Sequence, residues 1–232
     1  MPSSHSPNVI KESNRQRKTR AAEIVRRLHE EYPDAGTALS HRSALQLLIA
    51  TILSAQCTDV QVNLVTPGLF LKYPDAAAFA SADREELEQE IHSTGFYHNK
   101  ARSIILCCQQ LVERFDGQVP VEMADLVKLA GVGRKTANCV RGAAFQLPAI
   151  TVDTHVGRLA RRLALTSQNN PDKVESDIQS LVPEEYWYSF SNALIWHGRR
   201  VCHSRKPECA RCIVADLCPS RESPSANASK SV

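Results

Sequence analysis

Four cysteines crowd into a short polar segment near the C-terminus and limit what this part of the chain can become. Cys202, Cys209, Cys212 and Cys218 lie within 17 residues, in the order Cys-x6-Cys-x2-Cys-x5-Cys. Thiols at this density in a polar segment are typical of a four-sulfur metal site. Zinc sites usually add a second cysteine pair separated by about two to four residues. The longer gaps leave zinc open but favour iron and sulfide, and we predict a 4Fe-4S cluster.

The remaining four cysteines fall in apolar, helix-like stretches. The chain has no run of about 18 apolar residues, and its first 20 residues contain no apolar segment. We therefore expect neither a membrane span nor a secretory signal, and a cytoplasmic, nucleoid-associated location. Cysteines in that compartment stay as thiols or metal ligands. We predict that Cys57, Cys107, Cys108 and Cys139 are small buried side chains.

Apolar residues recur at helical spacing through most of the chain, as in Leu45, Leu48 and Ile52. No alternating strand pattern or Asn-Gly hairpin turn appears. With 232 residues and 43% hydrophobic content, the chain can bury one large core or two small ones without disulfides. We predict an all-α protein, with Pro67 as a candidate early end of the third helix. The expected helices span about 18–32, 43–55, 58–71, 84–93, 98–115, 122–129, 134–145, 154–165, 171–181 and 185–197.

Both ends of the chain are polar and contain little apolar surface, which predicts disordered tails at 1–17 and 219–232. The first tail is basic, although the net charge of the whole chain is only +3. This basic segment would either attract nucleic-acid phosphates without sequence preference or remain a solvated arm.

A Gly-Val-Gly turn joins two short predicted helices around residue 131. Gly131 and Gly133 permit a tight turn and leave backbone N–H groups uncovered where the second helix begins. Arg134 and Lys135 add positive charge at the same place. The pattern is typical of a helix-hairpin-helix, which grips a DNA backbone without reading bases. Taken alone, such a turn more often only caps a helix.

Lys135 and Asp153 form a candidate catalytic pair. An amine in the first turn of a helix, partly shielded from water, is disfavoured as the cation and more available as a nucleophile. A nearby carboxylate could accept its proton or stabilise a developing positive charge. The alternatives are a phosphate contact for Lys135 and a helix N-cap for Asp153.

Taken together, these residues closely resemble the endonuclease III family of helix-hairpin-helix DNA glycosylases. The resemblance covers about residues 20–220. It rests on the four cysteines and on the matching segments Leu53–Val60, Gly95–Ala101, Gly131–Asn138, Val152–His155 and His197–Gly198.

The resemblance implies a bifunctional glycosylase and lyase that removes oxidised pyrimidines from duplex DNA and cleaves abasic sites. Lys135 would attack the sugar and Asp153 would assist. Gln56 would fill the gap left by the flipped nucleotide, and Phe96 would wedge into the base stack. Further DNA contacts are expected from Gly131, Gly133, Arg134, His155, Arg205 and Lys206.

The same resemblance implies two lobes and a monomer with no membrane partner. A six-helix barrel would span 37–147, and a discontinuous cluster domain would combine 18–36 with 148–218. This chain departs from the family pattern at Ala130, Cys57 and Glu208. None of these departures touches the proposed chemistry.

Two alternatives remain. A sister glycosylase for mismatched adenine would carry a glutamate before the Gln56 region, but Ala50–Leu53 has no carboxylate. Monofunctional relatives generally lack the lysine. A non-catalytic DNA-binding module with structural zinc would bind abasic DNA without reacting, and would be colourless.

Overall fold

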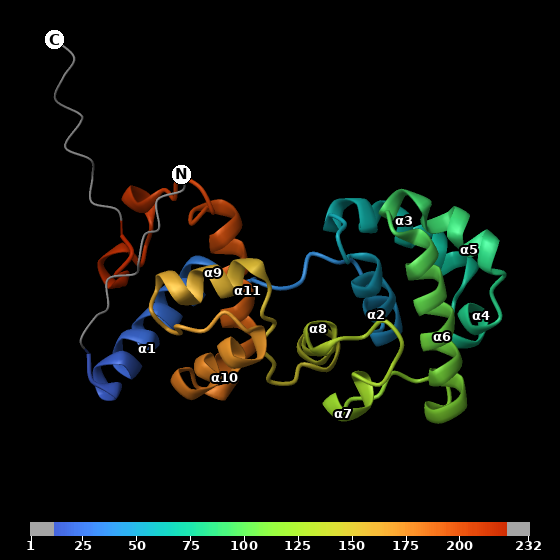
Figure 1. The fold of residues 1–232 in the computed structure, drawn as a ribbon, viewed down its shortest axis with the longest axis horizontal. Coiled ribbons are helices and arrows are strands. Elements are labelled where there is room, and N and C mark those ends of the chain that lie inside the picture. The colour runs from blue at the N-terminus through green and yellow to red at the C-terminus, as the bar shows by residue number, and fades with distance from the viewer. Residues whose placement is uncertain (1–11, 222–232) are drawn as a thin grey trace, which may run out of the picture. The chain divides into compact units, whose positions relative to one another are not determined.

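The computed structural model describes residues 12–221, and these contain helices but no strand, which confirms the all-α prediction (Figure 1). No helix in this range is long and apolar enough to cross a membrane. The longer helices are α1 (Asn14–Glu31), α2 (Ala44–Leu53), α3 (Asp59–Lys72), α5 (Arg84–Ile91), α6 (Tyr97–Phe115), α8 (Arg134–Phe145), α9 (Thr154–Arg162), α10 (Pro171–Leu181) and α11 (Trp187–Arg200). Shorter pieces are α4 (Ala76–Ala80), α7 (Met123–Leu126), η1 (His92–Thr94), η2 (Glu184–Tyr186), η3 (Cys209–Arg211) and η4 (Ala215–Leu217).

Helix α1 begins earlier than the sequence predicted. Ser13 and Gln16 form a reciprocal capping box that starts the helix at Asn14, inside the predicted tail. Arg17 and Arg20 then donate to the carbonyls of Leu165 and Leu163. These two cations therefore contribute to the folded structure and do not belong to a solvated arm. The tail predictions for residues 1–11 and 222–232 lie outside the described residues.

Helix α3 follows its expected range to within one residue, whereas α4 was not predicted. Helix α3 continues past Pro67 to Lys72, because Pro67 lies on an exposed face while Val62 and Leu69 hold the helix to the core. Helix α4 was missed because its five residues are too few to show a helical period. Its first turn is capped by Asp75, whose carboxylate accepts from the Ala78 amide at 2.8 Å.

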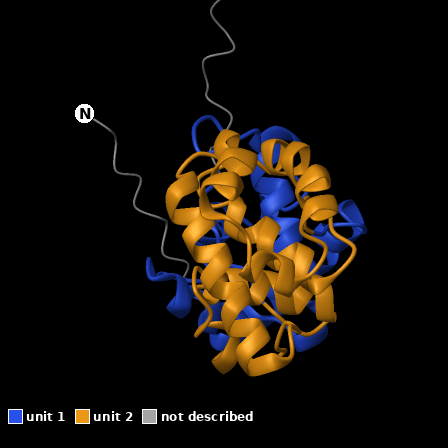
Figure 2. Cartoon of the chain, turned by 90° about the vertical axis from the view of Figure 1, so that its right-hand side faces the viewer, with its two compact units in different colours: residues 1–36, 150–232 blue, residues 37–149 orange. Residues whose placement is uncertain are grey.

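The described residues divide into two compact units (Figure 2). One unit is Thr37–Ala149, and the other combines Met1–Gly36 with Ile150–Val232. The predicted barrel domain, 37–147, begins at the same residue as this first unit and ends two residues before it.

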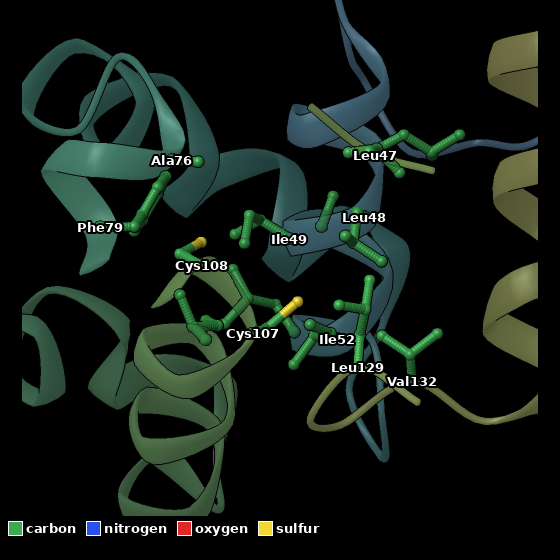
Figure 3. Packing of buried hydrophobic residues seen from close by; sticks show 14 of the residues in the cluster. Leu47, Leu48, Ile49, Ile52, Ala76, Phe79, Cys107, Cys108, Leu129 and Val132 are labelled. Carbon is green, nitrogen blue, oxygen red and sulfur yellow. The ribbon is translucent and has the colours of Figure 1, made fainter. Parts of the chain in front are cut away.

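The unit Thr37–Ala149 is built around one apolar core (Figure 3). Ile49, Phe79, Cys107 and Cys108 are fully buried in it. Burial raises the pKa of the Cys107 thiol to about 12, so this side chain behaves as a small hydrophobe. The prediction that these two cysteines are core residues is confirmed.

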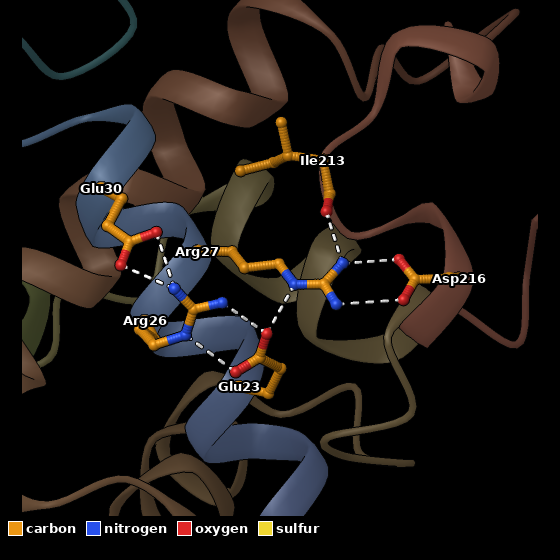
Figure 4. A network of polar contacts seen from close by, with 6 residues as sticks. All are labelled: Glu23, Arg26, Arg27, Glu30, Ile213 and Asp216. Carbon is orange, nitrogen blue, oxygen red and sulfur yellow. Dashed lines mark hydrogen bonds and ion pairs between the residues drawn. The ribbon is translucent and has the colours of Figure 1, made fainter.

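In the second unit, α1 packs against the C-terminal third of the chain. The apolar face of α1 packs in a core with residues of α9, α10 and α11. Polar contacts add to this core (Figure 4). Arg27 donates to the Ile213 carbonyl at 3.0 Å and pairs with Asp216 at 2.7 Å. Arg20 reaches the Leu217 carbonyl at 3.3 Å. The N-terminal helix therefore holds the segment that carries the last two cysteines of the cluster.

Candidate functional site

The Gly-Val-Gly hairpin places its two glycines under different constraints. Gly131 has φ +76°, and a Cβ there would lie 2.8 Å from the Cβ of Ser103. Backbone conformation and packing therefore both exclude a side chain. Gly133 has φ −92°, and a Cβ there would meet nothing within 4 Å. Nothing in the chain itself requires glycine at Gly133, which suits a place where a ligand approaches the backbone.

Helix α8 starts at this hairpin without a side-chain cap, since its N-cap residue is Gly133. Helices α1, α2, α3, α5, α9 and α10 are all capped by a Ser, Thr, Asp or Asn side chain. An uncapped N-terminus offers N–H groups and a positive dipole end to an anion. Arg134 and Lys135, the first two residues of α8, are exposed there. The partial shielding that we predicted for the Lys135 amine is therefore not provided by the described residues.

Three predicted DNA-contacting residues line one open pocket. Gln56, Phe96 and Gly131 surround a space of about 530 Å³, open solvent included. Gln56 has φ 53° and Phe96 has φ 49°, both in the left-handed region that non-glycine residues rarely adopt. The Phe96 side chain is 60% exposed. Strained backbone that carries an exposed aromatic ring is typical of a functional loop rather than of a packing device.

Lys100, which lines the same pocket, was missed by the sequence reasoning. Its side chain is buried, and its Nζ donates to the Thr94 carbonyl at 2.8 Å. Its backbone N–H donates to the Phe96 carbonyl at 3.1 Å. Burial lowers the pKa of Lys100. The lysine side chain thus ties the start of α6 to Thr94, on the other side of Phe96, and its place within Gly95–Ala101 was the available signal.

Asp153 lies in the other unit and caps α9. Its Oδ1 accepts from the Val156 amide at 2.8 Å, as the N-cap alternative expected. A carboxylate has two oxygens and several lone pairs, so capping does not prevent a chemical role. How Asp153 is placed relative to Lys135 remains a prediction, because each is described only within its own unit.

His155 follows Asp153 and packs against α11. A Cβ at Gly198 would lie 2.9 Å from the His155 Nδ1. Arg158 donates from Nη2 to that nitrogen at 3.1 Å, which places the proton of the neutral ring on Nε2. Burial lowers the pKa of His155 and favours the neutral ring. The His155 ring is thus held between Arg158 and the Gly198 backbone at the start of α9.

The four cysteines line one pocket of about 450 Å³, open solvent included. Within residues 12–221, no three Cys, His, Asp or Glu side chains gather tightly enough for a single metal ion. Four sulfurs around a shared space suit the larger body of a cluster. Burial raises the pKa of Cys212, and that of Cys218 to about 11, so bound positive charge must favour the thiolates. The residues therefore fit a 4Fe-4S cluster.

Two arginines of α9, also missed from the sequence, hold the loop after the first cluster cysteine. Arg162 donates to the Cys202 sulfur at 3.2 Å and to the His203 carbonyl at 2.7 Å. Arg158 donates to the Cys202 carbonyl at 3.0 Å. The same loop leaves Arg205 and Lys206 exposed, as a phosphate-contacting role requires. The spacing of Arg158 and Arg162, four residues apart on α9, was the signal available in the sequence.

Comparison with known proteins matches both parts of the site. Residues 49–184 match the model of the HhH-GPD superfamily base excision DNA repair protein, and residues 202–218 match the iron-sulfur binding domain of endonuclease III. The chain is 52% identical over 207 residues to endonuclease III of Synechocystis sp., covering 89% of this chain and 94% of that one. It is 42% identical to endonuclease III of Escherichia coli K12, covering 88% and 97%. A trapped endonuclease III–DNA covalent intermediate superposes with a TM-score of 0.83 at 41% identity, covering 88% and 96%.

Proposed function

Because the chain belongs to the endonuclease III family, it is a bifunctional base excision repair DNA glycosylase and lyase, and we propose that it excises oxidised pyrimidines from duplex DNA. It carries a 4Fe-4S cluster on Cys202, Cys209, Cys212 and Cys218, which supports the fold of its unit. We infer that it acts as a monomer on nucleoid DNA.

Lys135 carries the chemistry. Its neutral amine attacks C1′ of the damaged nucleotide, and the bond from C1′ to the base breaks as the base leaves with the bonding electrons. Asp153 takes the amine proton and favours positive charge at C1′. Asp153 then gives this proton to O4′ as the C1′–O4′ bond breaks, which opens the sugar ring and leaves a protonated imine at C1′. The imine makes the C2′ hydrogen acidic. Loss of that proton expels the 3′ phosphate with the electrons of its C3′–O bond.

Binding is assigned to the groups around the hairpin. Gly131, Gly133 and Arg134 hold phosphates on one side of the lesion. Gln56 fills the space left by the flipped nucleotide while Phe96 enters the stack, which offsets the few kcal/mol that flipping costs. His155, Arg205 and Lys206 contact phosphates from the cluster unit. The observation that carries this assignment is the exposed Lys135 in the first turn of an uncapped helix.

Borohydride trapping tests the proposal. The holoprotein is incubated with duplexes that carry one thymine glycol, one mismatched adenine or no lesion, and sodium borohydride is added. We expect a covalent adduct with thymine glycol alone, attached to the peptide that contains Lys135 by mass spectrometry. An adduct on another lysine would refute the assignment. A missing adduct with thymine glycol would refute the lesion class.

Replacing Asp153 with asparagine separates its two roles. Asparagine caps a helix as well as aspartate does, so we expect an unchanged melting temperature. Loss of the carboxylate should slow base release by about 10²–10⁴-fold in single turnover. The matched Asp153→Ala variant should also lose about 1 kcal/mol of stability with its cap. Normal base release by the asparagine variant would leave Asp153 as a cap alone.

The two glycines of the hairpin should respond differently to alanine. Gly131→Ala places a methyl 2.8 Å from Ser103 at positive φ, and we expect it to lose about 2 kcal/mol in urea unfolding. Gly133→Ala meets no atom and should unfold like wild type, yet bind an abasic duplex about tenfold more weakly. Equal affinities for wild type and Gly133→Ala would argue against backbone contact at that position.

A further inference from the structure

A buried hydrogen-bond chain runs from α1 to one cluster cysteine. The Tyr32 hydroxyl lies 3.0 Å from Nδ1 of His197. The other ring nitrogen, Nε2, lies 3.3 Å from the Cys212 sulfur. Tyr32 is 3% exposed and His197 is 2% exposed, so bulk water does not compete for these contacts.

The cluster fixes which atoms donate and which accept in these hydrogen bonds. A cysteine sulfur bound to iron is a thiolate and has no proton to donate, so it can only accept. His197 must then carry its proton on Nε2 to hydrogen-bond Cys212. A neutral imidazole with Nε2–H has an acceptor at Nδ1, which the Tyr32 hydroxyl satisfies by donating. Tyr32 therefore selects the ring form that donates to the sulfur.

Such a contact has a known electronic effect on iron-sulfur clusters. A hydrogen bond to a coordinating sulfur stabilises the more reduced state, because that state places more negative charge on the sulfur. His197 is the last member of this chain before the metal, and Tyr32 acts only through it. The contact is made across 165 positions of sequence, by the C-terminal end of α1 and the last turn of α11.

We propose that Tyr32 and His197 are positioning residues that tune the reduction potential of the 4Fe-4S cluster and protect it from oxidative loss. The proposal rests on the cluster site and on no assignment of the base-excision residues. Loss of either side chain should make the cluster easier to oxidise.

The test compares holoprotein variants by voltammetry on undamaged duplex DNA. We expect His197→Leu to shift the midpoint potential to a more negative value and Tyr32→Phe to shift it in the same direction by less. In the double variant, Tyr32→Phe should add nothing. Iron release by ferricyanide should be about tenfold faster than in wild type for His197→Leu. His197→Gln keeps an N–H donor, so its midpoint potential should lie between those of His197→Leu and wild type.

Tyr73→Phe is the matched control. Tyr73 is also a buried tyrosine, 6% exposed, but its hydroxyl lies 3.4 Å from Glu86 in the other unit. Its removal should leave the potential unchanged. A wild-type potential in both Tyr32→Phe and His197→Leu would overturn the proposal. So would a Tyr32→Phe shift that persists without His197, since Tyr32 would then act by another route.

A second measurement needs no variant. Nitrogen NMR of the wild-type protein labelled at histidine should show Nε2 protonated and Nδ1 unprotonated for His197. The opposite ring form would overturn the direction of the chain, even if His197→Leu lost its cluster.

Discussion

Lys135→Ala is expected to lose base release by about 10³-fold or more, with no covalent adduct after borohydride treatment. We propose Lys135 as the nucleophile, and the alanine has no amine to form a Schiff base. The variant should fold normally, since Lys135 is exposed and its removal leaves no cavity in the core. Single-turnover release of thymine glycol and the trapped band on a gel measure the two effects.

Lys135→Arg is the matched control for charge. It keeps a cation at the start of α8 and should bind an abasic duplex nearly as well as wild type. A guanidinium cannot form the imine under these conditions, so chemistry should fall as far as in the alanine variant. If the arginine variant instead releases the base at the wild-type rate, Lys135 is a phosphate contact and the nucleophile lies elsewhere.

Cys212→Ala should remove most of the stability of its unit before it affects catalysis. Cys202, Cys212 and Cys218 pack against the core that α1, α9, α10 and α11 share. Loss of the cluster should therefore cost more than about 5 kcal/mol, comparable to the whole stability of a domain. Iron content, soluble yield and limited proteolysis measure the outcome. We expect the surviving fragment to come from Thr37–Ala149, whose core contains no cluster ligand.

Cys107→Ala separates cluster loss from the loss of any buried thiol. Cys107 is fully buried in the other core. Its replacement by alanine should lower the free energy of unfolding by about 1 kcal/mol without changing the iron content. A Cys212→Ala protein that is well folded, free of iron and inactive would contradict this expectation. It would mean that the cluster contributes to turnover directly.

The sequence predicted the helices where their pattern is long and locally determined. The apolar period and the turn residues before α8 and α10 gave the same residue bounds as the structure, 134–145 and 171–181. Helix α4 was too short for such a pattern. The start of α1 was missed because its polar first turn resembles a tail until its capping box and the carbonyl contacts of Arg17 are seen.

The site was predictable where it consists of residues close together in sequence. The cysteine spacing and the glycine turn are local, and both could be read directly. Contacts between distant residues could not. His197 stood in a matching segment, yet its contact with Tyr32 depends on how α1 meets α11. Arg162 is likewise an ordinary helix cation until its approach to the Cys202 sulfur is known.

The division of one unit between the two ends of the chain sets an order for its synthesis. Residues 37–149 can complete their core while the ribosome is still translating the rest, but α1 has no partner until α9, α10 and α11 emerge. At about 5–20 residues per second, its apolar face waits on the order of ten seconds or more. The ligand set is complete only when Cys218 has left the exit tunnel. The complete cluster therefore forms after α1 has met its partners, whereas a transcript truncated before α9 would yield a chain with an exposed apolar helix for proteases to recognise.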